Sequence, residues 1–313
     1  MDWFQFHLND FARAWISILF QGIPFLLAGT LLAAIVDAFL PPAVFARLIP
    51  RNRFLAVATS GLLGLLFPLC ECGILPVLRR MLRKGLPVPC AVTYMLASPI
   101  VNVVVIGSTL VAFKNQGAEM MTVARVGLGY AVAVLVGWSL LRLPAAAILR
   151  PDLLGPVRRN LFAGGLPVRE TDPSELPLSA KGRHVLHCVV TDFLDVLMYL
   201  VLGSAAAALL STSFNQSLLL EWAGHPFVAI QLMMGVAVLL SLCSSSDAFV
   251  AAVFTTMPQS SRLAFLVFGP MFDLKLMFLY LFAFNRRFVL RLVITLYLLV
   301  SLGTLAIHYL RIL

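Results

Sequence analysis

Long apolar stretches alternate with short polar ones along most of the chain. About 20 consecutive apolar residues cross the hydrocarbon core of a bilayer as an α-helix. Six stretches of roughly that length carry little or no charge, and each predicts a membrane-spanning helix: Ala14–Val36, Gly85–Phe113, Val126–Leu141, Val196–Leu220, Leu263–Asn285 and Leu292–Tyr309. The pattern therefore predicts an all-α polytopic membrane protein.

Two further apolar segments are interrupted by small and polar residues. Phe54–Leu78 contains the run PLCECG at residues 68–73, and Trp222–Phe254 contains the run CSSSD at residues 243–247. Proline removes a backbone donor and glycine permits unusual dihedrals, so we expect the helix to be broken at residues 68–73. Non-helical backbone at membrane depth survives only where it is buried in protein or faces a watery cavity. We therefore expect the interrupted segments to point into the protein.

Three landmarks recur in the same order in the two halves of the chain. The aligned pairs are Gln21…Gly29 with Asp195…Gly203, Leu69-Cys70 with Leu242-Cys243, and Ser98-Pro99-x-x-Asn102 with Gly269-Pro270-x-x-Asp273, at shifts of 174, 173 and 171 residues. Internal repetition of this kind is typical of secondary transporters. The predicted organisation is a first transmembrane repeat over 1–141, a cytoplasmic linker rich in proline, glycine and charge over 142–183, and a second repeat over 184–313.

The placement of basic residues favours an inverted arrangement of the two repeats. If Phe54–Leu78 crossed the membrane, the basic clusters at 47–53 and 79–84 would lie on opposite faces, against the cytoplasmic bias of lysine and arginine. A re-entrant hairpin puts both clusters inside, and a second hairpin over Trp222–Phe254 does the same for the cluster at 286–291. Each half then has three spans and one hairpin, and the second half is inverted. Eight full spans with parallel halves are the alternative.

Composition excludes most other classes of protein. Of 313 residues, 61% are hydrophobic and 12% are charged, and the mean hydropathy is +0.97. Soluble domains are about half apolar and about a quarter charged. The net charge of +9 is not accompanied by a basic domain interleaved with aromatic residues, so we expect no nucleic-acid partner. The excess charge suits cytoplasmic loops that face anionic membrane lipid.

The interrupted segments carry the residues best suited to handle a solute. Cys70 and Cys72 supply two soft sulfur ligands, Glu71 supplies a carboxylate that would be costly beside lipid, and Gly73 follows them. The matching run in the second half adds a third sulfur, three hydroxyls and another carboxylate, from Cys243, Ser244, Ser245, Ser246 and Asp247. Brought together across a pseudo-twofold axis, these side chains would form a small polar site near the membrane midplane.

The third landmark predicts a kink in each half, followed by a polar side chain. Ser98 and Pro99 precede Asn102, and Pro270 precedes Asp273. An intramembrane carboxylate is by default a functional-site hypothesis, so Asp273 joins the candidate site. Residues two apart on a helix do not face each other. We therefore expect the nearby Lys275 to reach Glu71 or Asp247 from the facing half, or to extend toward the interface.

No enzymatic machinery is visible in the sequence. The chain has no G-x-x-x-x-G-K-[ST] phosphate loop and no serine-hydrolase or zinc-protease signature. We therefore expect no enzyme activity, no cofactor and no resident metal ion. Transport energy would come from an ion gradient, a substrate gradient or a separate subunit. The lone cysteines Cys90 and Cys188 are expected to be packing residues.

Several of these segments resemble a known family. FPLCECGILPV, the basic turn RRMLRKG and VTYMLASPIVN, together with CSSSDAF and FGPMFDLKLMF in the second half, resemble the bacterial predicted-permease family that includes the ArsP-type organoarsenical and arsenite efflux permeases. The resemblance implies a multi-pass permease of the bacterial inner membrane. It carries the family's motif onto Cys70, Cys72, Gly73, Pro76, Ser98, Pro99 and Asn102.

Together, these observations predict a secondary exporter of a small, soft, thiophilic solute such as arsenite or a trivalent organoarsenical. The sulfurs of Cys70, Cys72 and Cys243 would contact the metalloid, because trivalent arsenic bonds thiolates. Glu71, Asp247 and Asp273 would bind or relay a coupling proton. Expected partners are lipid, the solute, the proton and a second copy of the chain. Two alternatives stay open, a membrane thiol oxidoreductase that uses Cys70 and Cys72, and a passive channel.

Overall fold

The computed structural model describes residues 8–39, 50, 52–66, 71, 73–83, 85–149, 178–213 and 225–310. Its helices are α1 (Leu8–Phe39), α3 (Arg53–Leu66), α4 (Ile74–Arg83), α5 (Val88–Ala97), α6 (Val103–Ala112), α7 (Ala118–Leu140), α8 (Ala145–Ile148), α10 (Leu178–Ser213), α11 (Pro226–Leu240), α12 (Asp247–Val253), α13 (Gln259–Met271), α14 (Leu274–Ala283) and α15 (Arg286–Tyr309). These residues contain no β-strand, only one isolated bridge between Leu149 and Phe284. The predicted all-α polytopic fold is confirmed.

Five segments of the described chain are long and apolar enough to cross a membrane. They are Asn9–Ile35, Ala118–Leu140, Val185–Leu209, Gln259–Ala283 and Arg286–Tyr309. The expected span Gly85–Phe113 is instead divided into α5 and α6, of 10 residues each. At about 1.5 Å per residue, each of these two helices covers only about 15 Å, half of the hydrocarbon core. The chain therefore crosses there by means of a broken helix.

The first interrupted segment folds back on itself. Gly61 and Gly64 of α3 lie against Thr93 and Ser98 of α5, so α3 and α5 run in the same direction. Helix α4 packs against α5 and is joined to it by a tight turn at Gly85, which has a φ of 95° that favours glycine. Because α4 returns toward the start of α5, α3 and α4 form a hairpin. The described residues of its tip, between the two helices, are Glu71 and Gly73.

The open ends of this hairpin lie at what we call the basic end of the molecule, marked by Arg53 at the start of α3, Arg80 in α4 and Arg142 just after α7. The indole of Trp138, near the end of α7, donates to the carbonyl of Phe54 at 3.2 Å. The backbone N–H of Asn285, just before α15, donates to the carbonyl of Ile148 at 3.0 Å. These contacts place the start of α3 beside the end of α7, and the start of α15 beside α8.

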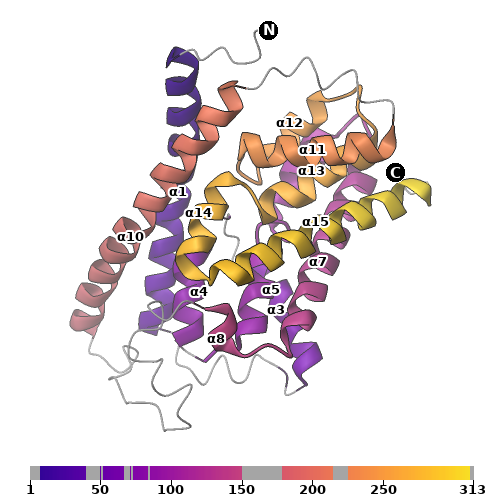
Figure 1. Ribbon diagram of the computed structural model, residues 1–313. Helices are drawn as coiled ribbons and strands as arrows, with labels where there is room; N and C mark the ends of the chain where they lie inside the picture. The colour runs from indigo at the N-terminus through magenta and orange to yellow at the C-terminus, as the bar shows by residue number, and fades with distance from the viewer. Residues whose placement is uncertain are drawn as a thin grey trace.

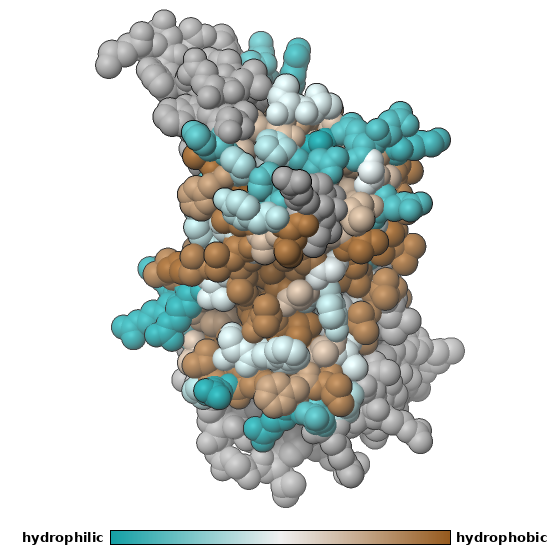
Figure 2. Space-filling model, turned by 90° about the vertical axis from the view of Figure 1, so that its right-hand side faces the viewer, coloured by the Kyte–Doolittle hydropathy of each residue, from teal (hydrophilic) through white to brown (hydrophobic). Residues whose placement is uncertain are grey.

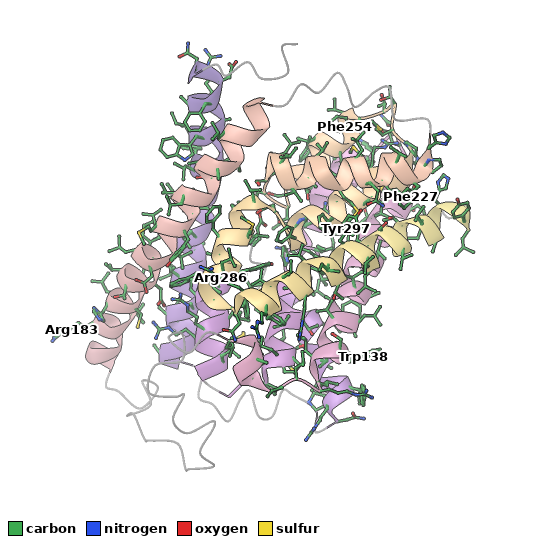
Figure 3. All side chains as sticks on the ribbon, viewed as in Figure 1. Trp138, Arg183, Phe227, Phe254, Arg286 and Tyr297 are labelled. Atoms are coloured by element: carbon green, nitrogen blue, oxygen red, sulfur yellow. The ribbon has the colours of Figure 1, made fainter. Side chains whose placement is uncertain are left out.

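The second hairpin, α11 and α12, opens at the other end. The side chain of Gln116, in the turn between α6 and α7, donates to the carbonyl of Ala252 at 3.3 Å and accepts from Arg262 of α13. The hydroxyl of Ser260 lies 3.1 Å from a ring nitrogen of His308, near the end of α15. Figure 3 shows Trp138 toward one end of the molecule and Phe254, which follows α12, at the other.

Helices α1 and α10 form an antiparallel pair along one edge of the bundle (Figure 1). Trp15 donates to the hydroxyl of Ser204 at 3.1 Å, and Gly22 faces Leu200. The N-terminal part of α10 is tied to α4 at the basic end, where Arg80 and Asp192 are 2.8 Å apart. Helix α10 therefore rises from the basic end, and α1 descends toward it.

Apolar side chains cover the part of the surface that would meet lipid. Figure 2 shows hydrophobic residues across the middle of one face and most hydrophilic residues nearer its two ends. Large exposed apolar side chains on the long helices include Phe20, Val123, Leu194, Met198, Leu290 and Leu302. Inside the bundle, every residue from Cys90 to Asn102 is buried. Helix α5 and the break after it thus lie in the protein core, whereas α6 exposes Val103, Val104, Leu110 and Val111 at the surface.

Candidate transport site

A buried lysine joins the two hairpin tips to the start of α14. The Nζ of Lys275 lies 3.0 Å from Oε1 of Glu71, in the first tip, and 3.3 Å from Oδ2 of Asp273. It also donates to the backbone carbonyls of Ser241 and Leu242, at 3.0 and 3.1 Å. The side chains of Glu71, Asp273 and Lys275 are at most 5% exposed. Of the two partners expected for Lys275, the structure pairs it with Glu71.

The break between α13 and α14 explains how Asp273 reaches Lys275. Asp273 has an extended backbone and is the N-cap of α14, where its Oδ1 accepts from the N–H of Leu276 at 2.7 Å. The argument that residues two apart cannot face each other was wrong here, because it assumed a continuous helix. Pro270 sits in the last turn of α13, just before this break. The carboxylate of Asp273 therefore caps α14 and also belongs to the charged cluster.

Asn102 has the equivalent position in the first half. Its side chain accepts from the N–H of Val104 at 2.9 Å and caps α6, while Ser98 and Pro99 form the turn that ends α5. The expected kink is thus a complete break with a capped restart. Asn102 thus acts as the cap of its own helix.

A second buried ion pair joins α7 to the start of α12. The Nη2 of Arg125 lies 2.9 and 2.8 Å from the two carboxylate oxygens of Asp247. Arg125 also donates to the hydroxyl of Thr109 at 2.7 Å and to the carbonyl of Ser244 at 3.0 Å. Its side chain is 1% exposed and that of Asp247 is 4% exposed. Each charge is therefore neutralised inside the protein.

Arg125 was missed as a site residue because the expected span began at Val126, whereas α7 begins at Ala118. Asp247 itself predicts a buried basic partner, since a carboxylate inside a span requires a compensating cation. A search of the neighbouring segments for such a cation would have found Arg125.

The second tip is a compact turn held by both buried cations. The N–H groups of Ser246 and Asp247 donate to the carbonyl of Cys243, at 2.8 and 3.0 Å. The hydroxyl of Ser245 lies 3.7 Å from the sulfur of Cys243, which is buried. Ser241, where α11 ends, has a φ of 45°, a strained conformation for a residue other than glycine. The ammonium of Lys275 on the Ser241 carbonyl stabilises that conformation.

Two matched glycines bring the long helices against this site. A Cβ on Gly29 of α1 would lie 2.5 Å from the Cα of Gly73 in the first tip. A Cβ on Gly203 of α10 would lie 2.8 Å from the Cα of Lys275. These glycines align in the two halves of the sequence, and both abut the charged cluster. Cys70 and Cys72 lie outside the described residues, which contain no group of three or more His, Cys, Asp or Glu arranged to hold a metal ion.

Comparisons with known proteins place this architecture in a family. Residues 7–309 match the family ArsP_1, described as a predicted permease. The chain belongs to this permease family. The permease is 38% identical to "UPF0718 protein YcgR" of Bacillus subtilis over 294 residues, which cover 93% of this chain and 95% of the relative.

A second relative is described as a component of an assembly. The permease is 30% identical over 281 residues to the "Putative two-component membrane permease complex subunit" of Streptococcus mutans, covering 89% of this chain and 88% of the relative. No solved structure matches the permease. The predicted membership of the family, and with it a role in the membrane as a permease, is confirmed.

Proposed function

We propose that the permease is a secondary exporter, in the bacterial inner membrane, of a small thiophilic solute such as arsenite or a trivalent organoarsenical. One observation carries the proposal. Two non-helical tips and the restart of a broken helix converge on a buried cluster of charges, in a bundle whose long helices expose large apolar side chains. Non-helical backbone and buried charge at membrane depth are characteristic of the substrate sites of secondary transporters.

The two halves of the bundle act as inverted repeats around this cluster. The recurrence of the packing supports this part of the proposal: α3 lies against α5 and α7, as α11 lies against α13 and α15. The first hairpin opens at the basic end and the second at the opposite end. Alternating access would then tilt one repeat against the other around the charged cluster.

The sulfurs provide the affinity for the solute. Cys243 lies in the second tip, one helical turn before Asp247, and Cys70 and Cys72 flank Glu71 in the sequence of the first tip. Soft thiolates select soft, thiophilic ions. The hydroxyls of Ser244, Ser245 and Ser246 provide hydrogen-bond partners for the oxygen atoms of arsenite. The carboxylates Glu71, Asp247 and Asp273 are the candidates for coupling export to proton entry.

Metalloid accumulation in cells tests the exporter. Cells without other arsenical exporters would be loaded with arsenite or trivalent methylarsenite, and intracellular arsenic would be measured with and without the permease. Cys70→Ser, Cys72→Ser and Cys243→Ser should each raise accumulation at unchanged membrane abundance. Cys90→Ser and Cys188→Ser are the matched controls, because both residues are buried packing cysteines outside the two tips. Full export by the triple variant C70S/C72S/C243S would contradict the role of the sulfurs.

A protonophore separates a coupled exporter from a channel. Collapse of the proton gradient should abolish export against a concentration gradient, whereas flux through a channel would persist. A disulfide between Cys70 and Cys72 that forms during turnover, detected by thiol trapping, would instead identify an oxidoreductase. Because one relative is named as a complex subunit, each assay should be performed in native membranes, where partner subunits are retained.

A further inference from the structure

The buried charges of the site do not balance. Arg125 and Asp247 neutralise each other. Lys275 has two carboxylates, Glu71 and Asp273, at 3.0 and 3.3 Å. With all three groups ionised, the Lys275 cluster has a net charge of −1. A net charge in a buried environment is costly unless a further positive charge compensates it.

The hydrogen bonds identify where a compensating charge is missing. An ammonium group has three N–H donors, and those of Lys275 meet three acceptors: Oε1 of Glu71 and the carbonyls of Ser241 and Leu242. Oδ1 of Asp273 is occupied by the N–H of Leu276. Oε2 of Glu71 and Oδ2 of Asp273 are both buried and accept no hydrogen bond from the described residues. One oxygen on each carboxylate is thus available to a proton.

We propose that Glu71 and Asp273 share one proton, bound at Oε2 of Glu71 or Oδ2 of Asp273, and that this is the coupling proton of the exporter. The coupling role rests on the proposed function, but the binding of the proton does not. Two carboxylates on one buried cation bind a single proton between them, because one proton neutralises the cluster. Asp247 is excluded, since Arg125 bonds both of its oxygens.

Two described side chains near the cluster, Tyr280 and Arg125, make their hydrogen bonds to other groups. The hydroxyl of Tyr280, on the next turn of α14, donates to the carbonyl of Met271 at 2.9 Å. Arg125 is directed toward Asp247 and Thr109. Neither of these two side chains donates to Oε2 of Glu71 or Oδ2 of Asp273.

Because Lys275 contacts both tips, binding of the proton would change how strongly the two hairpins are held together. Its ammonium is bonded to the carboxylate of the first tip and to two carbonyls of the second. Proton loss would strengthen the attraction of Lys275 to its carboxylates, and proton gain would weaken it. Because the same ammonium holds both tips, the protonation state of one shared site would set how tightly the two hairpins are joined.

Reaction with dicyclohexylcarbodiimide tests the proton site without any transport assay. This apolar reagent adds to a protonated, membrane-embedded carboxyl group and leaves a stable adduct that peptide mass spectrometry locates. The purified, detergent-solubilised permease should take up one reagent per chain, on Glu71 or Asp273, and labelling should fall as pH rises. Asp247 should remain unlabelled. Monodisperse elution and unchanged helicity would verify that each variant is folded.

The single variants make the sharing of the proton testable. In Glu71→Gln or Asp273→Asn, the remaining carboxylate balances Lys275 and stays ionised, so labelling of the remaining carboxyl should fall at least tenfold. In Lys275→Gln, both carboxylates lose their cation, and labelling should persist to higher pH than in the wild type. Full labelling of Glu71 in Asp273→Asn, or of Asp273 in Glu71→Gln, would overturn the shared proton. A decrease in carbodiimide labelling on addition of sodium chloride, but not of potassium chloride, at constant pH would identify a sodium ion as the bound cation and would also overturn the shared proton. If labelling behaves as expected but no arsenical is exported, the proposed function fails and the proton site stands.

Discussion

The pair formed by Arg125 and Asp247 gives a quantitative test of how charge is accommodated in the bundle. Arg125→Met removes the cation and leaves the carboxylate of Asp247 buried without a counter-charge, and Asp247→Asn does the reverse. The two side chains are 1% and 4% exposed, so solvent cannot compensate. Removing one partner of a buried ion pair costs about 3–5 kcal/mol. Loss of the bonds to Thr109 and Ser244 places Arg125→Met at the upper end of that range.

The double variant R125M/D247N separates charge from packing. Replacing both members of a buried pair by neutral groups is often close to neutral. We therefore expect the double variant to be more stable than either single variant, although it carries more substitutions. In chains of 150–250 residues, about 3–5 kcal/mol lowers the unfolding temperature by about 6–20 °C, and we expect a smaller shift in this chain of 313 residues.

The measurement is the fraction of detergent-solubilised protein that still elutes as a monodisperse peak after heating over a range of temperatures. Arg125→Lys keeps the charge but loses the planar fork of donors, and should fall between the wild type and Arg125→Met. Lys114→Ala, at an exposed position, should be silent. A double variant whose loss equals the sum of the two single losses would refute the electrostatic reasoning, because the two residues would then be acting independently.

Three further predictions follow from the packing and the caps. Gly29→Ala and Gly203→Ala should each lower the free energy of unfolding by about 1–3 kcal/mol, because the added Cβ would meet backbone atoms at 2.5 and 2.8 Å. The control is Gly127→Ala, whose added Cβ meets nothing within 4 Å and which should be neutral or stabilising by up to about 1 kcal/mol. Equal unfolding temperatures of all three variants would contradict the close approach of Gly29 and Gly203 to backbone. Asn102→Ala should lower the free energy of unfolding by about 1 kcal/mol, because it removes the cap on α6, whereas Asn102→Asp should retain the cap. Equal unfolding temperatures of Asn102→Ala and the wild type would refute this role. In a cysteine-free background, a membrane-impermeant thiol reagent added outside cells should label Asn115→Cys and not Asn52→Cys, and the opposite result would reverse the orientation of the bundle.

The long spans and the location of the charged cluster could be predicted from the sequence, because both depend on the cost of exposing polar groups to lipid. The runs around Glu71 and Asp247 stand out for that reason, and the structure brings their tips to two adjacent ion pairs. The break between α5 and α6 was harder to predict. Its residues are as apolar as those of a continuous helix, and one proline alone indicates only a kink.

A local helix break and a pairing between distant segments were the other limits. Asp273 and Lys275 face each other because Asp273 lies outside the helix, and no periodicity in the sequence reports a cap of this kind. Arg125 was overlooked because hydropathy ends a span at its first charge, whereas a fully buried pair continues it. The second error arises because a charge neutralised by a partner far away in the sequence no longer behaves as a boundary.

The exchange of charges between the halves has a consequence for how the protein is made. Asp247 is synthesised 122 residues after Arg125, and Lys275 follows Glu71 by 204 residues. At about 5–20 residues per second, Asp247 is synthesised about 6–24 s after Arg125, and Lys275 about 10–41 s after Glu71. During that interval, the inserted N-terminal segments contain uncompensated ions and cannot reach their final packing. We therefore expect a chain terminated after the first half to be a substrate of membrane proteases, not a stable half-transporter.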